Sequence, residues 1–351
     1  MDKIKVAVLG GTGTVGQRYV QLLEGHPWFE LSEICASESS AGKRYADAVR
    51  GRWKISADVP EYAADIAVKE CIPELDAVAL LSGLDSSVAG DIEEMYANRG
   101  YIVSSNSRNH RMDPDVPLLI AEVNPEHVKA VEKQMERRKN SGFIITNPNC
   151  STIGLAIPLK ALYDEFSIGK VNVTTMQAIS GAGYPGMSAF DMVDNVHPCI
   201  PGEEEKIQTE TQKILGCYDD GFIYADIEIA ASCNRVFVLD GHKEDVFIEI
   251  GGDPDIEHVQ KTLENFRSVP QDLGLPSAPE KPIIIRHEQD RPQPRYDRNA
   301  GNGMSVVVGR VRKAPTGDYV FECLSHNTIR GAAGCSILNL ELLKSCGYVG
   351  V

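Results

Sequence analysis

One cysteine stands at the junction between a β-rich segment and a mostly apolar run with the length of a helix. Residues 147–152 read Asn-Pro-Asn-Cys-Ser-Thr, with Cys150 as the fourth, and residues 153–162 follow as the apolar run. A thiol at a helix start faces unpaired backbone N–H groups and the positive end of the helix dipole, which favour the thiolate that attacks carbonyl carbon. The same N–H groups would hold the oxyanion formed in that attack. The pattern predicts a nucleophile, and a buried, inert thiol is the alternative.

A second segment combines an arginine with a histidine. Residues 233–242 read Cys-Asn-Arg-Val-Phe-Val-Leu-Asp-Gly-His. On an extended strand Arg235 and Leu239 share one face, and His242 follows at a glycine turn. An arginine offers a planar fork to a carboxylate, and a histidine at a strand end suits general acid/base work. Taken singly, each is more often structural, as half of a surface ion pair or as a histidine that satisfies a turn.

A glycine-rich turn near the start of the chain joins an apolar segment to a helix-like one. Residues 10–16 read Gly-Gly-Thr-Gly-Thr-Val-Gly, between a predicted strand over 3–9 and a predicted helix from 17. This order predicts a dinucleotide site, because glycines let the backbone approach a pyrophosphate that sits on the helix N-terminus. A plain turn is the alternative. The expected cofactor contacts are Gly10, Thr12, Gly13, Thr14, Val15 and Gly16, with Ser82 and Gly83 after a later strand.

The segment after the second predicted strand bears on the choice of cofactor. Residues 37–44 read Ser-Glu-Ser-Ser-Ala-Gly-Lys-Arg. A site for NAD expects a carboxylate here to hold the ribose hydroxyls, and Glu38 would serve. Three serines and two cations suit a 2′-phosphate better, so the segment favours NADP.

Strand-like and helix-like segments alternate up to Cys150, and strands joined by short turns follow it. The first part predicts an N-terminal Rossmann-like dinucleotide-binding domain of doubly wound α/β type. The second predicts an α+β catalytic and dimerisation domain with a mainly antiparallel sheet. Because a lone apolar helix needs a partner face, the terminal segment should return to the first domain. We expect domains over 1–149 with 328–351 and over 150–327.

Composition narrows the class of protein. The chain has 351 residues, enough for two domains, and its formal charge of −15 argues against binding to nucleic acid or an anionic membrane. Its nine cysteines form no CxxC pair and no cluster at zinc spacing, so we expect a reducing compartment and no metal site. A predicted strand at the very start leaves no room for a signal peptide, and no apolar run reaches the roughly 18 residues of a membrane span. A soluble, cytoplasmic protein is expected.

Five segments together resemble aspartate-semialdehyde dehydrogenases, in particular the branch found in archaea and fungi. They are the Gly-Thr-Gly-Thr-Val-Gly turn, residues 147–152, Gln-Ala-Ile-Ser-Gly-Ala-Gly from Gln177, Cys-Asn-Arg with Gly-His up to His242, and Ser-His-Asn-Thr-Ile-Arg-Gly-Ala-Ala-Gly from Ser325. The likeness extends over essentially the whole chain. The spacing from Cys150 through Gln177 and Arg235 to His242 matches the pattern of the family.

The resemblance implies a role for each member of this group. Cys150 matches the acyl-accepting nucleophile, and His242 matches the acid/base. Gln177 matches the glutamine that orients substrate beside the cysteine, and Arg235 the arginine that grips the substrate carboxylate. The implied reaction is NADPH-dependent conversion of L-4-aspartyl phosphate to L-aspartate-4-semialdehyde through a cysteine thioester. It serves the biosynthesis of lysine, methionine, threonine and isoleucine.

The resemblance also implies residues at the phosphate, amine and nicotinamide ends. Arg111 corresponds to the arginine that binds the departing phosphate, and Asn149 to an asparagine that lines the same pocket. Lys206 and one acid of residues 203–205 resemble the pair that contacts the phosphate and the substrate amine, and Glu203 is our choice. The segments that hold the nicotinamide correspond to Ser180, Gly181 and Asn327.

One departure from the family concerns the cofactor. Relatives in this branch often carry an arginine where Ser39 stands, which weakens the case for a 2′-phosphate and leaves Ser37, Ser40 and Lys43 as its expected grip. NADP stays the expected cofactor, with NAD as a weaker alternative. Family members are usually dimers or tetramers built through the second domain. The expected partners are therefore the small-molecule substrate, phosphate and further copies of the chain, in a homodimer or homotetramer.

Other functions remain open at this point. A malonyl- or succinyl-CoA reductase on the same scaffold needs the same cysteine, histidine and NADPH but releases coenzyme A, and Asn149 and Arg111 favour phosphate. N-acetylglutamyl-phosphate reductase fits less well, because the Gly-Cys-Tyr-Pro context of its cysteine is missing here. A non-catalytic nucleotide sensor would keep the glycine turn and carry an inert Cys150.

Overall fold

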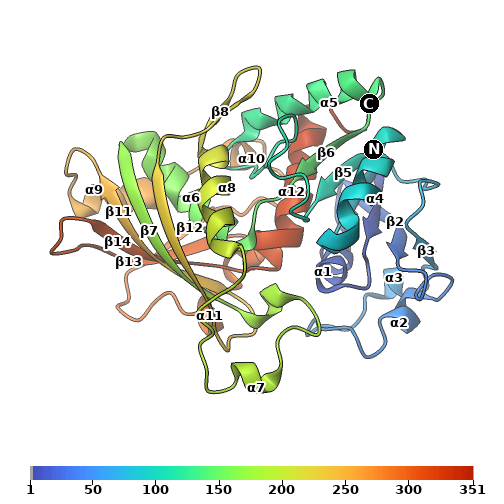
Figure 1. Ribbon diagram of the computed structural model, residues 1–351, viewed down its shortest axis with the longest axis horizontal. Coiled ribbons are helices and arrows are strands. Elements are labelled where there is room, and N and C mark those ends of the chain that lie inside the picture. Colours follow the sequence, from blue (N-terminus) through green and yellow to red (C-terminus); the bar gives the residue numbers. More distant parts are fainter. Residues whose placement is uncertain (1–2, 351) are drawn as a thin grey trace.

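The chain folds into two lobes, as Figure 1 shows for the computed structural model, which describes residues 3–350. The N-terminal lobe, blue to cyan in the figure, is a sheet flanked by helices. The second lobe, green to orange, is a larger sheet with helices gathered on one side.

A six-stranded sheet forms the centre of the first lobe. Its order is β3-β2-β1-β4-β5-β6, and every adjacent pair is parallel. The strands are β1 (Ile4–Leu9), β2 (Phe29–Ala36), β3 (Val68–Glu70), β4 (Ala79–Ser82), β5 (Ile102–Ser105) and β6 (Phe143–Thr146). Residues of β4, β5 and β6 are buried throughout, as in a sheet covered on both faces. The predicted Rossmann-like α/β fold is confirmed.

Helices cover this sheet and leave one crevice at its carboxyl edge. They are α1 (Thr14–Leu22), α2 (Tyr45–Ala48), α3 (Glu61–Ala64), α4 (Ser86–Asn98), a 3-10 turn (Pro125–Lys129) and α5 (Ala130–Arg138). The strand order reverses direction between β1 and β4. Open α/β sheets bind their ligands at such a switch point, which here is where the glycine turn lies.

The second lobe is built on a mixed sheet, in which three of the five strand pairs are antiparallel and two are parallel. Its order is β10-β7-β11-β14-β13-β12, in which β10–β7 and β12–β13 are parallel and the other pairs antiparallel. The strands are β7 (Ile168–Gln177), β10 (Glu228–Arg235), β11 (His242–Ile250), β12 (Ile283–Arg286), β13 (Val306–Lys313) and β14 (Tyr319–Ser325). The segment from β7 to β10 carries two helices, and a crossover of this length permits parallel pairing.

One face of the mixed sheet is buried under helices. The elements outside the sheet are α6 (Cys150–Glu165), α7 (Ala189–Met192), α8 (Glu203–Leu215), the pair β8 (Cys217–Tyr218) and β9 (Phe222–Ile223), α9 (Ile256–Glu264), α10 (Val269–Asp272) and α11 (Pro294–Asp297). Helix α6 lies on the sheet, and Ile153 and Ile157 share a core cluster with Val173 and Val246. The other face carries exposed side chains at alternate positions of β7 and β11.

The chain ends in a helix that packs into the first lobe. A π-helical turn (Ile329–Ala333) leads into α12 (Gly334–Ser345). Ile337 and Leu340 of α12 belong to the same buried cluster as Val6 and Val8 of β1. This packing is in line with the expected return of the terminal segment to the first lobe, and the boundaries at 149/150 and 327/328 stay a prediction.

The segment around His242 differs from the expected strand. β10 ends at Arg235, and residues 236–241 form a connection in which Gly241 takes a φ of 104°. His242 then opens β11 instead of following the end of a strand. The alternating apolar residues of the connection do not lie in the sheet; Phe237 and Leu239 are exposed.

Candidate active site

Three strands of the second sheet end at one edge and carry the predicted catalytic side chains there. β7 ends at Gln177, and its parallel neighbour β10 ends at Arg235, which is its partner in register. β11 runs antiparallel to β7 and begins at His242, so this residue lies at the same edge. The start of α6 meets the edge, with Sγ of Cys150 3.1 Å from Nε2 of His242.

The thiol of this pair is neutral at rest. Burial and, next, Glu203 raise the pKa of Cys150, Arg235 and Arg111 lower it, and together these influences bring it to about 12. Lost hydration therefore works against the thiolate that was expected at the helix start. The residue is nevertheless only partly buried and lines a cavity, so a substrate can reach it.

The N-cap of α6 further limits what the helix start can do. Oδ1 of Asn149 accepts hydrogen bonds from the N–H groups of Ser151 (2.9 Å) and Thr152 (3.3 Å). Such capping satisfies orphan donors of the first turn. These two N–H groups are therefore occupied by the cap, and the oxyanion expected from the sequence would need another donor. The imidazole of His242, in contact with the sulfur, is a donor that remains.

The imidazole of His242 is also neutral at rest. Burial, then Arg235 and His326, hold the pKa of His242 well below its usual range. The backbone N–H of Ala178 donates to its Nδ1 at 3.0 Å. Since Nδ1 accepts this bond, the neutral ring carries its proton on Nε2, the atom that faces the sulfur.

Arg235 and Gln177 are fixed beside the pair by short-range bonds. Arg235 is 5% exposed, and its Nη1 donates to the carbonyl of Ala178 at 2.9 Å and to Oε1 of Gln177 at 3.4 Å. Nε2 of Gln177 donates to Oε2 of Glu203 at 3.2 Å. The guanidinium is thus held at one corner, with its plane set for a carboxylate.

Glu203 is the one acid of the three that enters the cavity. Its Oε1 accepts from Nζ of Lys206 at 2.6 Å, and its Oε2 accepts from Nδ2 of Asn149 at 2.7 Å. Burial would raise the pKa of Glu203, but Lys206, Asn149 and Gln177 together lower it, so it is a carboxylate. Glu204 instead accepts from the N–H of Cys233.

Arg111 lines the same cavity. Its Nη1 donates to Oε1 of Glu210 at 2.9 Å, and its Nη2 to the carbonyl of Asn106 at 3.0 Å. Arg108 lines the cavity as well. Our sequence reasoning missed both Arg108 and Glu210. Arg108 stands three residues before Arg111 in the same basic segment, which is a signal that was available, whereas Glu210 has no motif of its own.

One cavity of about 310 Å³ joins these groups to the glycine turn. Its lining comes from both lobes, and includes the predicted residues Thr14, Val15, Gly83, Arg111, Asn149, Cys150, Gln177, Ser180, Gly181, Glu203, Lys206, Arg235 and Asn327. Asn327 ties two segments of the second lobe together, because its Nδ2 donates to Oγ of Ser180 (2.8 Å) while its Oδ1 accepts from the N–H of Gly241 (2.8 Å).

The glycine turn has the shape that a dinucleotide needs. A Cβ on Gly16 would collide with the carbonyl oxygen of Gly10, and Gly10 itself has a φ of 73° and lies against Gly83. α1 begins directly after Gly13, so its N-terminus faces the cavity. The residues present therefore fit a bound pyrophosphate.

Not every expected cofactor contact faces the cavity. Ser82 is fully buried, and its hydroxyl donates to Glu93 at 2.6 Å. Ser40 is buried too, while Ser37 is exposed and Lys43 donates to the carbonyl of Ser39 at 2.6 Å. Ser37 and Lys43 are the ones that present polar atoms at the surface.

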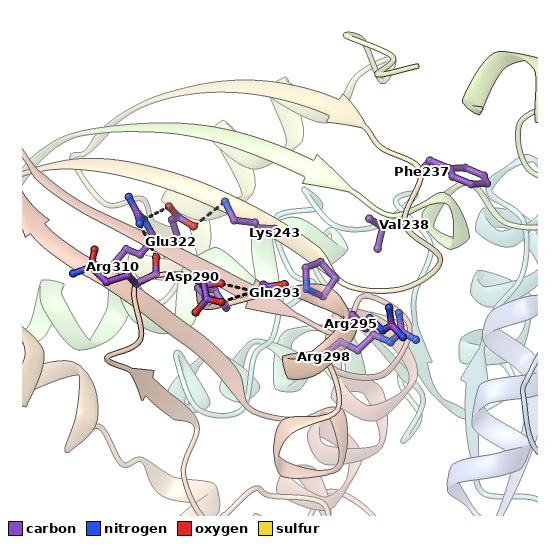
Figure 2. Close-up of a pocket in the computed structure, with 12 residues that line it drawn as sticks. Phe237, Val238, Lys243, Asp290, Gln293, Arg295, Arg298, Arg310 and Glu322 are labelled. Carbon is purple, nitrogen blue, oxygen red and sulfur yellow. Dashed lines mark hydrogen bonds and ion pairs between the residues drawn. The ribbon is translucent and has the colours of Figure 1, made fainter. Parts of the chain in front are cut away.

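A second hollow lies on the open face of the mixed sheet and has a different character. Figure 2 shows Lys243, Glu322 and Arg310 around it, and Oε2 of Glu322 lies 3.0 Å from Lys243 Nζ, and Oε1 2.7 Å from Arg310 Nε. These charges satisfy one another, and none of the predicted site residues lines the hollow. Over residues 3–350 there is no cluster of three or more histidine, cysteine or acidic side chains suited to a metal, and no helix long and apolar enough to cross a membrane.

Two family models match the chain along its length. Residues 5–131 match the NAD binding domain of semialdehyde dehydrogenases, and residues 159–330 match their dimerisation domain. These matches define the class: a two-domain semialdehyde dehydrogenase. An aspartate-semialdehyde dehydrogenase of Methanothermobacter thermautotrophicus is 49% identical over 97% of this chain and 99% of its own. The chain belongs to the aspartate-semialdehyde dehydrogenase family.

Two further relatives bear on this assignment, one a solved structure and one a protein with a different name. The crystal structure of aspartate semialdehyde dehydrogenase with NADP from Candida albicans superposes with a TM-score of 0.91, at 42% identity over 99% of this chain and 100% of that one. A malonyl CoA reductase (NADP) of Metallosphaera sedula is 42% identical over 99% of this chain and 98% of its own length.

Proposed function

We propose that this chain catalyses the NADPH-dependent reductive dephosphorylation of L-4-aspartyl phosphate to L-aspartate-4-semialdehyde, and the reverse reaction. The observation that carries the proposal is the contact of 3.1 Å between Cys150 and His242, with Arg235 and Arg111 lining the same cavity as the cysteine. In the cell the reaction would serve lysine, methionine, threonine and isoleucine biosynthesis, in the cytoplasm.

The charged side chains around the sulfur match the groups of such a substrate. Arg235 would grip the α-carboxylate, and the carboxylate of Glu203 would accept from the α-amine. At the other end Arg111, Lys206 and Asn149 would bind the phosphate. Holding both ends places the acyl carbon beside the sulfur, which lowers the entropic part of the barrier.

Sulfur chemistry then proceeds in two balanced steps. In the first, the S–C bond forms, the C–O bond to phosphate breaks, and the proton lost by the thiol balances the departing hydrogen phosphate. NADPH, when bound, supplies the hydride that the thioester carbon needs. In the second, that hydride would form the C–H bond of the aldehyde, the C–S bond breaks, and the sulfur regains a proton from solvent, which Nε2 of His242 is placed to pass.

The cofactor would lie along the glycine turn and reach the sulfur end past Ser180, Gly181 and Asn327. Gly10, Gly13 and Gly16 would admit the pyrophosphate, with Thr12, Thr14, Val15 and Gly83 around it. Ser37, Ser40 and Lys43 are the proposed grip on a 2′-phosphate. Ser37 and Lys43 support it better than the buried Ser40.

The decisive assay is NADP⁺ reduction with L-aspartate-4-semialdehyde and phosphate, repeated with arsenate in place of phosphate and with NAD⁺. Reduction that depends on the anion is expected. No reduction, or reduction that ignores the anion, would overturn the proposal.

Malonyl-CoA reduction is a second candidate, because a relative with that name matches almost the whole chain. It needs the same thiol and imidazole, but a larger leaving group. Arg111 and Lys206 close to Asn149 favour a compact anion. Offering aspartyl phosphate and malonyl-CoA in one NADPH assay separates the two, and we expect the phosphate to be used.

We also propose that the chain assembles as a homodimer or homotetramer through its second lobe. The match to a dimerisation domain over 159–330 supports this, as do exposed apolar side chains there, with Phe190 98% exposed and Phe237 and Phe247 also accessible. Sedimentation equilibrium on the wild-type protein should give a mass of two or four chains. A monomer at micromolar concentration would contradict the proposal.

A further inference from the structure

Helix α8 carries one continuous stripe of charged side chains, of which the first two line the cavity. Glu203, Lys206, Glu210 and Lys213 follow at steps of three and four residues, which places them on one face of the helix. The first two belong to the proposed substrate site. Glu210 and Lys213 lie one and two turns further on and are 2% and 0% exposed, so neither reaches solvent.

Glu210 holds two parts of the site at once. Its Oε1 accepts from Nη1 of Arg111 at 2.9 Å, and its Oε2 accepts from the backbone N–H of Asn149 at 2.6 Å. Asn149 is the N-cap of α6 and directly precedes Cys150. A single carboxylate therefore spans the distance from the proposed phosphate arginine to the helix that carries the nucleophile.

Lys213 fixes the backbone that carries the same arginine. Its Nζ donates to the carbonyl of Arg111 (2.8 Å), to that of Asp113 (3.1 Å) and to that of Val116 (3.0 Å). Glu210 thus sets the guanidinium while Lys213 sets the main chain. Both come from the helix that carries Glu203 and Lys206.

The way Arg111 is held leaves a defined part of it for a ligand. Nη1 is held by Glu210 and Nη2 by Asn106, while Nε is buried without a partner among residues 3–350. Because Glu210 offsets the charge of Arg111, attraction of phosphate depends on where the remaining N–H groups point. The direction of the guanidinium, more than its charge, then decides binding.

We propose that Glu210 is a positioning residue that aligns Arg111 with the sulfur of Cys150, so that the leaving phosphate and the nucleophile act on one acyl carbon. The inference rests on the proposed function, since it concerns the phosphate of that reaction. It adds a residue that has no contact with substrate and that acts through Arg111 and Asn149.

Glu210→Gln tests this, because glutamine keeps the size but has one acceptor oxygen for two donors. In the direction of semialdehyde oxidation we expect KM for phosphate to rise about 10-fold, as for loss of one charge-assisted hydrogen bond. KM for NADP⁺ should change less than about twofold, since no contact is lost there. Glu205→Gln, an exposed position of the same helix, is the matched control and should leave both constants unchanged.

A double-mutant cycle with Arg111→Lys shows whether Glu210 acts through the arginine. In the lysine background, Glu210→Gln should change KM for phosphate by less than about twofold. An unchanged KM for phosphate in Glu210→Gln alone, or fully additive effects in the double variant, would overturn the inference. Wild-type protein without any phosphate dependence would instead overturn the proposed function, so the two failures are distinct.

Folding of the variants is checked by thermal unfolding. If Glu210→Gln does not fold, Glu210→Asp takes its place, because aspartate keeps both acceptor oxygens and withdraws them by one methylene. KM for phosphate should again rise selectively. A folded Glu210→Asp protein with wild-type KM for phosphate would contradict the positioning role.

Discussion

Two parts of the site differ in charge: Cys150 and His242 contact each other, whereas Glu203 and Arg111 are each bonded to a charged partner. Burial raises the pKa of Cys150 and lowers that of His242, so the first pair is neutral. The pKa of Glu203 is lowered despite burial, because Lys206 and two amide groups hold the charge. Burial neutralises a group that lacks a partner and preserves the charge of one that has several.

This contrast assigns different tasks to the two parts of the site, which we call the first end (Cys150 and His242) and the second end (Glu203 and Arg111). A neutral thiol and imidazole lose and regain a proton only as bonds to the acyl carbon form and break. The charged end keeps a fixed electrostatic pattern that a dianionic substrate can recognise. Changes at the first end should therefore affect the rate, and changes at the second should mainly affect binding.

The largest effect is expected for Cys150→Ala, which removes the nucleophile. Phosphate-dependent oxidation of the semialdehyde should be undetectable, while NADPH still binds, as measured by fluorescence titration. Substantial residual turnover in this variant would contradict a covalent thioester.

His242→Ala should lower kcat by roughly 10²–10⁴-fold, because general acid/base help is lost. KM for phosphate should stay near the wild-type value, since the residues proposed to bind phosphate are unchanged. Loss of phosphate affinity in this variant would contradict the proposal that the first end governs the rate and the second end governs binding. His242→Gln, which keeps some volume, controls for collapse of the cavity.

Arg235→Lys keeps the charge but loses the planar fork, so substrate affinity and rate should fall together. Loss of about 2 kcal/mol, or roughly 30-fold in kcat/KM for the semialdehyde, is expected. Steady-state kinetics with varied semialdehyde at saturating phosphate gives this value. A change confined to KM for phosphate would argue that Arg235 binds elsewhere on the substrate.

Glu244 extends the comparison to the pH dependence of stability. It is buried behind α6 with Oε1 unpartnered, and burial raises its pKa from 4.5 to about 8. Between pH 4.5 and 8 the folded protein keeps this proton, whereas the unfolded chain has lost it. The contribution of Glu244 to the free energy of unfolding is therefore fully present below pH 4.5 and is lost as the pH rises toward 8.

The expected slope from this carboxyl is a fall of up to about 1.4 kcal/mol per pH unit in the free energy of unfolding. Glu244→Gln cannot ionise, so its unfolding free energy should decline less over the same window. Urea unfolding of both proteins at several pH values measures the difference. Parallel curves for the wild type and the variant would show that Glu244 does not titrate in this range.

Local patterns in the sequence predicted the parts of the molecule that depend on a few neighbouring residues. The glycine turn before α1 and the apolar strands of the first lobe follow from composition and spacing, and the family resemblance supplied roles for residues such as Gln177. The mixed pairing of the second sheet did not follow, because strand partners are chosen across the long segment between β7 and β10.

The ionisation of the site was also beyond the sequence. A helix start indicated a thiolate at Cys150, but how far the pocket excludes water depends on groups such as Glu203 that come from distant elements. Glu210 was missed for a related reason. It lies in a run of charged residues on α8, and only the fold brings it to Arg111 and Asn149.

Because Gln177, Arg235 and His242 each stand at a strand terminus on one edge, their spacing in space is set by strand pairing. Deleting one residue inside β7 would turn every later side chain of that strand to the opposite face. The segment between β7 and β10 is constrained as well, because Ala178 bonds to His242 and Arg235 and α8 carries Glu203. Changes in length are therefore expected only in the turns that lie outside these elements.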